Sequence, residues 1–337
     1  MSGGVDSSVA AALLVIEGYD VIGAFMKNWD GCDWKRERRD ALRVASKLGI
    51  ILHTFDFERA YRQRVHAYMV AEYRAGRTPN PDVLCNSEIK FDLLLRVAAD
   101  LGCEKMATGH YARVCGNQPV HLRKGVDNEK DQSYFLCRLG QKELLRVLFP
   151  IGDLKKDDVR KRARLLGLST ADKKDSQGLC FIGKVDLACF LKKEITPHVG
   201  NIVTTSGDVL GTHEGIAFYT IGQRKGLNIG GTEPYFIVER RLETNELVVA
   251  HEGDDVLYAS ALTAVDVQWT LGEPPAMPFA CVAKIRYRQT DEPCTVTLAE
   301  NGAWHVRFDK PQRAVAPGQF VVFYQGDELV GSGVIEK

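Results

Sequence analysis

Up to about residue 185, short apolar runs alternate with amphipathic helical stretches, and this alternation is the feature that most constrains the fold. Helical spacing of apolar residues occurs in residues 9–17, 35–48, 59–74 and 91–101, and short apolar runs occur in residues 20–26, 51–57 and 105–108. Strands that alternate with helices are typical of a parallel sheet covered by helices. We therefore predict an α/β, doubly wound parallel-sheet first domain.

After about residue 200, helical periodicity disappears and short β-type runs are separated by Gly, Asn or Asp turns. Such runs occupy residues 235–239, 247–251, 262–267, 281–287, 294–298, 304–308, 320–324 and 329–334. This spacing indicates a small barrel or sandwich. Because 337 residues exceed what one ordinary core organises, we expect several domains.

Composition argues against a membrane or secreted protein. The longest apolar run, residues 9–16, is far shorter than the roughly 20 residues that a spanning helix needs. Residues 1–4 have neither the basic region nor the apolar stretch of a secretion signal, so we expect a cytoplasmic or organelle-matrix protein. Nine cysteines form an odd set without zinc-type spacing, which argues against a disulfide scaffold and a zinc site.

The charge balance shows that any affinity for nucleic acid must be local. Lys plus Arg and Asp plus Glu both number 44, so no overall field attracts RNA. Basic residues cluster in residues 155–164 and again in residues 286–288, where a tyrosine lies between two arginines. An aromatic ring between guanidiniums suits stacking and phosphate contact. The first cluster fits an RNA-binding patch and the solvated face of an ordinary helix equally well.

A Gly- and Ser-rich segment opens directly into the first predicted helix. It consists of Ser2, Gly3, Gly4, Val5, Asp6, Ser7 and Ser8. Free amides, serine hydroxyls and the helix dipole at such a start bind phosphate, and Asp6 could hold a magnesium ion. The string resembles the pyrophosphate loop of N-type ATP pyrophosphatases, which adenylate a carbonyl oxygen. The Walker pattern is absent, so transfer of the γ-phosphate is not implied.

Loops of this kind normally follow a central β-strand, whereas the present sequence begins at the loop itself. Since a missing buried strand would remove several apolar side chains from the core, we expect the true start to lie upstream.

Two cysteines have polar, turn-forming neighbours. Cys85 follows G-R-T-P-N-P-D (residues 76–82) and is expected near the start of a helix, where the dipole favours thiolate, with Asp82 able to handle a proton. Cys180 lies within K-K-D-S-Q-G-L-C-F-I-G (residues 173–183), beside two lysines. Two thiols in exposed polar loops suggest a sulfur relay. The other seven cysteines are expected to be structural or incidental.

Several separated blocks together resemble the tRNA-specific 2-thiouridylase family over nearly the whole chain. These blocks are S-G-G-V-D-S-S (2–8), F-M-K-N-W (25–29), G-R-T-P-N-P-D (76–82), L-C-N (84–86), A-T-G-H-Y-A (107–112), K-D-Q-S-Y-F-L (130–136), K-K-D-S-Q-G-L-C-F-I-G (173–183), G-Q-R-K-G-L (222–227) and R-Y-R-Q (286–289). The resemblance implies a catalytic domain over residues 1–188, a small central tRNA-binding domain over residues 189–255 and a C-terminal β-barrel over residues 256–337.

The resemblance also implies roles for individual residues. The loop at residues 2–8 would bind ATP with Met26 and Gly109, Cys180 would carry a persulfide, and Cys85 would be its partner nucleophile. Asn80, Pro81 and Asp82 would meet the target base. Other contacts with tRNA would come from His110, Lys130, Asp131, Gln132, Arg286, Tyr287 and Gln319.

The implied reaction is ATP-dependent 2-thiolation of the wobble uridine of tRNA, with lysine, glutamate and glutamine acceptors as substrates. ATP would adenylate the 2-oxygen, and the Cys180 persulfide would supply the sulfur. Cys85 would either free hydrosulfide from the persulfide or form a disulfide with Cys180 after sulfur has left. The sulfur donor would be a cysteine desulfurase or a relay protein. The protein would be cytoplasmic, or mitochondrial if eukaryotic.

Two other functions compete with this interpretation. A pyrophosphate-loop enzyme that adenylates a small metabolite, such as an argininosuccinate or GMP synthetase, would share the loop but needs no paired thiols. A noncatalytic RNA-binding protein would retain affinity for tRNA without thiolating it.

Overall fold

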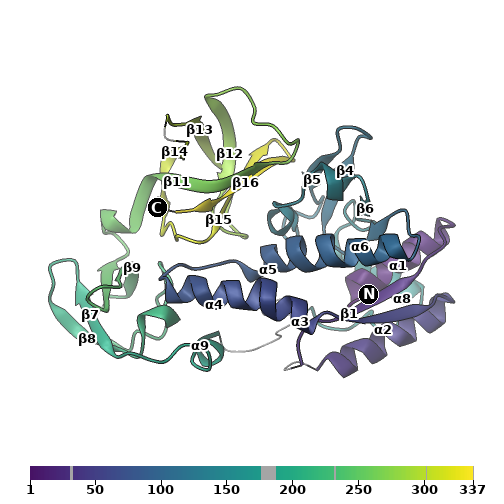
Figure 1. Cartoon of the computed structure of the whole chain (residues 1–337), viewed down its shortest axis with the longest axis horizontal. Coiled ribbons are helices and arrows are strands. Elements are labelled where there is room, and N and C mark those ends of the chain that lie inside the picture. Colours follow the sequence, from purple (N-terminus) through teal and green to yellow (C-terminus); the bar gives the residue numbers. More distant parts are fainter. Residues whose placement is uncertain (31–32, 176–186, 231–232, 301, 337) are drawn as a thin grey trace.

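The computed structural model describes residues 1–30, 33–175, 187–230, 233–300 and 302–336. An α/β part, a small β-rich part and a β-barrel follow one another along the chain (Figure 1). The predicted fold class is therefore confirmed. None of the described helices has the length and apolar character needed to cross a membrane.

The first part contains two pairs of parallel strands with helices packed around them. Strand β1 (Gly23–Lys27) pairs with β2 (Leu52–Asp56), and β3 (Met106–Ala107) pairs with β6 (Val147–Leu148). Apart from the two central helical segments described next, the described helices of this part are α1 (Val5–Ile16), α2 (Trp34–Leu48), η3 (Ser133–Leu136), α7 (Gln141–Leu144), α8 (Lys156–Leu165) and α9 (Leu187–Leu191). Helix α1 packs against both α2 and α8.

Two long helical segments lie side by side in the centre of the molecule (Figure 1). One comprises α3 (Glu58–Tyr61), the π-helical turn η1 (Arg62–His66) and α4 (Ala67–Arg74). The other comprises α5 (Pro81–Leu84), the π-helical η2 (Cys85–Leu94) and α6 (Leu95–Asp100). The second segment starts ten residues before the helix predicted from residue 91, because Asn80 caps it and Pro81 suits its first position.

The C-terminal strands form a closed barrel. Their order is β11 (Tyr258–Trp269), β14 (Trp304–Arg313), β13 (Glu292–Leu298), β12 (Phe279–Lys284), β15 (Phe320–Gln325) and β16 (Glu328–Ile335), with β16 pairing back to β11. A hairpin from the first part, β4 (Ala112–Cys115) and β5 (His121–Lys124), extends this sheet through the β16–β5 pairing. That hairpin was not predicted from the sequence.

The barrel and the first part also share one hydrophobic core. Phe320, Val322 and Tyr324 of the barrel pack with Leu122 and Tyr134 of the first part, and all five side chains are buried. The two parts therefore form one continuous body.

The middle part is a four-stranded sheet with its own smaller core. Its strands are β7 (Gly200–Thr204), β8 (Val209–His213), β9 (Tyr235–Arg241) and β10 (Glu246–His251), with the 3-10 turns η4 (Ile216–Phe218) and η5 (Asp255–Leu257). Strand β10 lies in the centre, parallel to β7 and antiparallel to β9. Ile202, Ile237 and Leu247 are fully buried within this sheet.

Candidate active site

The Gly- and Ser-rich segment forms a tight loop at the N-terminus of α1. Gly3 has a φ of +75°, in the left-handed region that favours glycine, and Gly4 is the N-cap, where no side chain caps the helix. The Ser2 and Ser7 hydroxyl oxygens lie 3.1 Å apart, and the Ser8 hydroxyl donates to the Gly4 carbonyl over 2.7 Å. Amide groups and hydroxyls at an uncapped helix start fit the phosphate ligand predicted for this loop.

Met26 and Gly109 lie near the carboxyl ends of parallel strands, where ligands of open α/β sheets bind. Gly109 also approaches the loop closely. A Cβ atom built on it would lie 2.6 Å from the Ser7 nitrogen and 2.7 Å from the Asp6 carbonyl carbon. No other residue fits at position 109 without moving the start of α1.

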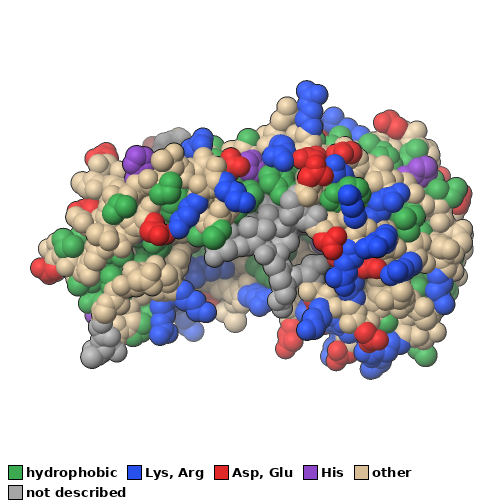
Figure 2. Space-filling model, turned by 90° about the horizontal axis from the view of Figure 1, so that it is seen from below, with side chains coloured by type: hydrophobic (Ala, Val, Ile, Leu, Met, Phe, Trp, Pro, Cys, Tyr) green, Lys and Arg blue, Asp and Glu red, His purple; other side chains and the backbone are tan. Residues whose placement is uncertain are grey.

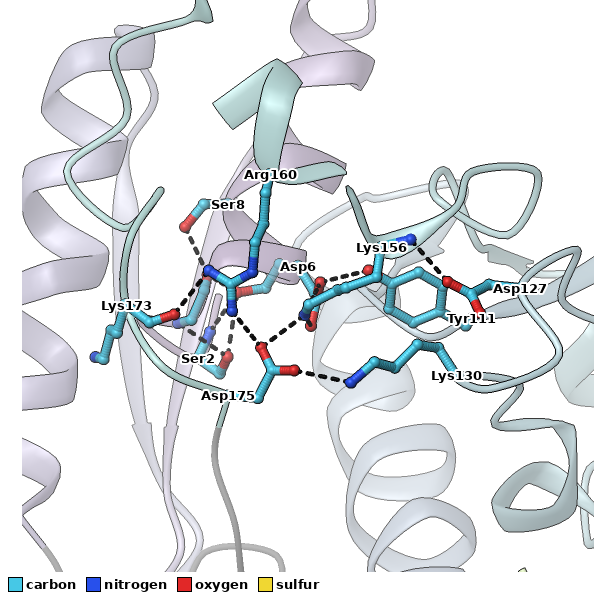
Figure 3. Close-up of polar contacts among 12 residues, drawn as sticks. Ser2, Asp6, Ser8, Tyr111, Asp127, Lys130, Lys156, Arg160, Lys173 and Asp175 are labelled. Carbon is cyan, nitrogen blue, oxygen red and sulfur yellow. Dashed lines mark hydrogen bonds and ion pairs between the residues drawn. The ribbon is translucent and has the colours of Figure 1, made fainter. Parts of the chain in front are cut away.

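Asp6 is held by two side chains from other segments (Figure 3). Lys156 donates to both carboxylate oxygens over 2.8 Å, and the Tyr111 hydroxyl donates to Oδ1 over 2.8 Å. Burial and the Asp6 charge both raise the pKa of Tyr111, which keeps this hydroxyl protonated. The Asp127 carboxylate accepts from the Lys156 backbone N–H over 2.8 Å and so fixes the start of α8.

A second carboxylate, Asp175, gathers three cations beside the loop (Figure 3). Its Oδ1 lies 2.8 Å from both the Lys156 ammonium and the Arg160 guanidinium, and its Oδ2 lies 3.1 Å from Lys130. Burial tends to raise the pKa of Asp175, but the hydrogen bonds from Lys156 and Lys130 outweigh it and lower the pKa. Asp175 is therefore ionised at neutral pH.

Lys173 approaches the opposite side of the loop. Its ammonium donates to the Gly3 carbonyl over 2.9 Å and to Glu37 and Asp40 of α2, each over 2.7 Å. Lys156 thus contacts the loop through Asp6, Arg160 donates to the Lys173 carbonyl, and the Lys173 ammonium contacts the loop at the Gly3 carbonyl. The sequence placed the first two in a basic patch of open purpose and Lys173 beside Cys180. Only the packing of α8 against α1 reveals their shared location.

The helix that begins at Pro81 positions Asp82 and Cys85. The Asn80 side chain accepts from the Val83 N–H over 3.3 Å, so Asn80 is the N-cap and Cys85 lies in the second turn. Cys85 is fully buried in the same core as Ile89. Cys85 therefore lies near the start of a helix, as predicted, but the prediction that it is exposed is wrong, because residue 85 falls on the inward face of that helix.

Cys180 lies outside the described residues. Of the other cysteines, the described ones include a cross-strand pair in the barrel, Cys281 and Cys294, whose sulfur atoms are 3.6 Å apart.

The barrel and the middle part both contact the loop that precedes Asn80. Gln319 donates to the carbonyls of Thr78 and Pro79 over 2.8 and 3.2 Å, and the Asn80 amide donates to Gln319 over 3.4 Å. Arg240 of β9 donates to the Thr78 hydroxyl over 3.3 Å. The loop that leads to Asp82 is thus held by all three parts of the chain.

Arg286 and Tyr287 follow strand β12 of the barrel and are half-buried. The Arg286 guanidinium donates to the carbonyls of Arg313 and Ala314, and burial together with the Arg313 charge lowers its pKa. The Tyr287 ring packs against Phe135, with centroids 4.2 Å apart. Burial raises the pKa of Tyr287, and the carboxylates of Asp131 and Asp82 add to the increase.

Of the remaining predicted tRNA contacts, His110 and Asp131 are buried, Gln132 is half-buried, and Lys130 is partly exposed and pairs with Asp175. The His110 imidazole is buried between Phe91 and Phe149 and hydrogen-bonds the Thr108 hydroxyl over 2.8 Å. Asp131 is buried and accepts from the Gly125 and Ser133 N–H groups. The Gln132 side chain accepts from the Tyr111 N–H. Direct contact of His110 or Asp131 with RNA would require these side chains to become exposed.

Figure 2 shows Lys and Arg side chains on both sides of a recess in one face of the molecule. The whole chain has no net charge, so this local clustering supplies the positive surface that the sequence required for contact with a polyanion.

Family models match almost the whole chain. They are described as a tRNA methyl transferase HUP domain over residues 1–184, a tRNA methyl transferase PRC-barrel domain over residues 188–251 and an aminomethyltransferase beta-barrel domain over residues 259–335. These matches follow the α/β part, the middle part and the barrel seen in the structure.

Curated relatives match over the full length. Proteins named tRNA-specific 2-thiouridylase MnmA from Lysinibacillus sphaericus and Enterococcus faecalis are each 48% identical, and MnmA 2 from Geobacillus kaustophilus is 49% identical. The alignments cover 100% of this chain and 93%, 94% and 93% of the respective relatives. Identity at this level over every domain shows that the chain belongs to the tRNA-specific 2-thiouridylase family.

Proposed function

We propose that this protein is a tRNA sulfurtransferase that uses ATP to convert the wobble uridine of tRNA into 2-thiouridine. The observation that carries the proposal is the full-length similarity, at 48–49% identity, to proteins named for this activity. The phosphate-binding loop and the helix of Asp82 and Cys85, which lie in one α/β part, support it.

ATP binds at the loop of residues 2–8 in this proposed reaction, and Met26 and Gly109 complete its site. Lys156, Arg160 and Lys173 neutralise phosphate charge, because Lys156 and Lys173 contact the loop and Arg160 contacts the Lys173 carbonyl. Magnesium normally binds through one or two carboxylates plus substrate phosphates, and Asp6 is the carboxylate of the loop. Since Lys156 holds both Asp6 oxygens, a magnesium ion there would compete with this ammonium.

The first step makes the 2-oxygen of uridine a leaving group. The oxygen attacks the α-phosphorus of ATP, pyrophosphate departs, and the uridine carries AMP on its 2-oxygen. The developing negative charge on the pyrophosphate falls beside the cations around the loop, which lowers the barrier electrostatically.

The second step delivers sulfur from a persulfide on Cys180. In one route, its terminal sulfur attacks carbon 2 and AMP leaves, and Cys85 then attacks the Cys180 sulfur, freeing the thiouridine. In the other, Cys85 first attacks the Cys180 sulfur and frees hydrosulfide, which displaces AMP. Both routes end in a Cys85–Cys180 disulfide. A thiol reductant then supplies two electrons and converts this disulfide back into two thiols. Asp82, three residues before Cys85, accepts or donates the proton that is transferred when Cys85 reacts.

The central domain and the β-barrel are proposed to hold the tRNA. We divide the chain into the catalytic domain (residues 1–188), a central tRNA-binding domain (residues 189–255) and the β-barrel (residues 256–337). Asn80, Pro81 and Asp82 meet the base, and Gln319 holds the same loop through the Thr78 and Pro79 carbonyls. Arg286 and Tyr287 are further proposed contacts with the tRNA. A cysteine desulfurase or a relay protein would recharge Cys180.

The test is thiolation of unmodified tRNA in vitro with ATP, magnesium and a persulfide donor, scored as 2-thiouridine in the digested RNA. We expect product from the parent and from Cys115→Ser, an exposed-cysteine control, but none from Cys180→Ser or Cys85→Ser. ATP-independent product would contradict the adenylation step. Binding of tRNA without any product would favour the noncatalytic alternative.

A further inference from the structure

Asp175 is the meeting point of three cationic side chains that come from different segments of the first domain. Lys156 and Arg160 extend from α8, and Lys130 extends from the loop before η3. All three ion-pair distances lie between 2.8 and 3.1 Å (Figure 3). Lys156 is the most enclosed, with 10% of its side chain exposed, against 34% for Asp175.

Two of these cations, Lys156 and Arg160, also contact the phosphate-binding loop or the chain beside it. Lys156 bridges Asp175 to Asp6 in the first turn of α1, with 2.8 Å to each carboxylate. Arg160 donates to the carbonyls of Ala171 and Lys173, and Lys173 in turn reaches the Gly3 carbonyl. The Asp175 carboxylate therefore lies at the edge of the site proposed for ATP.

Charge and hydrogen-bond capacity make Asp175 resemble a phosphate group in its contacts. Its two oxygens accept three charge-assisted hydrogen bonds, which is the arrangement that a phosphate oxygen pair requires from lysine and arginine. With Asp6 and Asp175 in place, three positive side chains face two negative ones. The polyphosphate of ATP brings several more negative charges to the same cations.

We propose that Asp175 is an internal competitor of the ATP phosphates for Lys130, Lys156 and Arg160. This inference rests on the proposed ATP-dependent function and adds a residue that sets the affinity for polyphosphate. Because the cations pair with Asp175 when the site holds no phosphate, the apparent affinity of the site for polyphosphate is lower than it would be if the cations were free. The same contacts keep three like charges from repelling one another in the ligand-free protein.

The opposite role for Asp175 is that of a positioning residue, which holds the lysines and the arginine in place for the phosphates. The two roles predict changes of opposite sign when the charge is removed. A competitor weakens binding, so its loss strengthens binding. A positioning residue improves binding, so its loss weakens binding.

The experiment is calorimetric titration of the full chain with inorganic pyrophosphate, ATP and adenosine, comparing the parent with Asp175→Asn. We expect the dissociation constants of pyrophosphate and ATP to fall about fivefold, a total of about 1 kcal/mol, because partly exposed ion pairs contribute little net free energy. Adenosine lacks the phosphates, so its affinity should not change. Unchanged or weaker binding of pyrophosphate would overturn the proposal.

Asp172→Asn is the matched control, because Asp172 lies in the same segment but pairs with Arg164 over 2.9 Å and is 79% exposed. Its removal should leave pyrophosphate affinity unchanged. Asp175→Glu retains the charge and should bind as the parent does. If Asp175→Asn does not fold, Asp175→Ser removes the same charge and is expected to give the same fall in the dissociation constants.

Failure of this inference and failure of the proposed function give different results. If the parent binds ATP and thiolates tRNA while Asp175→Asn binds pyrophosphate no more tightly, only the role of Asp175 is wrong. If the parent binds neither ATP nor pyrophosphate, the proposed function itself is wrong.

Discussion

Among the residues of the candidate site, Lys156 links the loop to the rest of the domain. The whole residue is 8% exposed, and its ammonium donates to Asp6 and Asp175. Its backbone N–H donates to Asp127. A buried ammonium is retained at low cost only where carboxylates compensate for its lost hydration, and here two of them do.

We predict that Lys156→Gln weakens ATP binding at least about tenfold, or ~1.4 kcal/mol, because the cation nearest the loop is lost and Asp6 is left to repel phosphate. Equilibrium dialysis with labelled ATP measures this change. Lys161→Gln is the control, since Lys161 lies on the same helix, is 68% exposed and pairs only with Asp158 among the contacts described. Equal effects of the two variants would contradict a specific role for Lys156.

His110 illustrates a residue whose charge state is set by burial. Burial lowers its pKa well below 6.5, and Lys90 lowers it further, so the folded protein holds it neutral. Below pH 6.5 the unfolded chain binds a proton that the folded chain excludes. Stability should therefore fall as the pH drops, by up to about 1.4 kcal/mol per pH unit from this residue.

Urea unfolding at several pH values between about 5.5 and 7.5, about one unit on either side of the usual histidine pKa, tests this prediction. His110→Gln should reduce the slope of unfolding free energy against pH, whereas His305→Gln, at an exposed barrel position, should not. An unchanged slope in His110→Gln would show that other groups account for the acid sensitivity.

At the scale of elements, the contact between Gly109, which follows β3, and the start of α1 determines the shape of the loop at residues 2–8. Gly109 permits this contact because it has no side chain to meet Ser7 and Asp6. The two elements are a hundred residues apart in the sequence, so only packing brings them together.

We predict that Gly109→Ala weakens ATP binding by about tenfold, because a Cβ atom 2.6 Å from the Ser7 nitrogen must displace the loop. The folded protein should persist, since the backbone of the loop can shift. Gly253→Ala is the control, because nothing lies within 4 Å of a Cβ atom there. Parent-like ATP affinity in Gly109→Ala, measured by dialysis, would refute the role of this contact.

At the scale of the whole molecule, three domains meet at Thr78. Its N–H donates to the Pro317 carbonyl, its own carbonyl accepts from Gln319, and its hydroxyl accepts from Arg240. Burial lowers the pKa of Arg240 to about 10, yet it remains charged at neutral pH. Asn80 and Asp82 follow within four residues, so the joint positions the residues proposed to meet the target base.

We predict that Arg240→Met lowers the free energy of unfolding by about 1–3 kcal/mol, because the Thr78 hydroxyl and the Tyr219 carbonyl lose a buried donor. Arg241→Met should change it by less than about 0.5 kcal/mol, since its ion pairs with Glu239 and Glu246 lie at the surface. Urea unfolding of both variants gives the comparison. Equal losses would show that the joint contributes nothing specific.

Local chemistry in the sequence determined the elements and their class. Alternating apolar runs and amphipathic stretches specified helices and strands because the two structures repeat every 3.6 and every two residues. The segment from Ser2 to Ser8 predicted a helix start suited to an anion, since glycine backbone and serine hydroxyls act within a few residues. The family resemblance confirmed by the relatives arose from the same short blocks.

Tertiary structure alone decided which distant side chains meet. Lys156, Arg160 and Lys130 converge on Asp175 because α8, the loop before η3 and the segment after α8 meet in space, and no local pattern encodes that approach. Cys85 is buried because its helix starts at Pro81 and turns that face into a core shared with the barrel. Ion pairs and burial depend on distances in space, and a sequence pattern reports only separations along the chain.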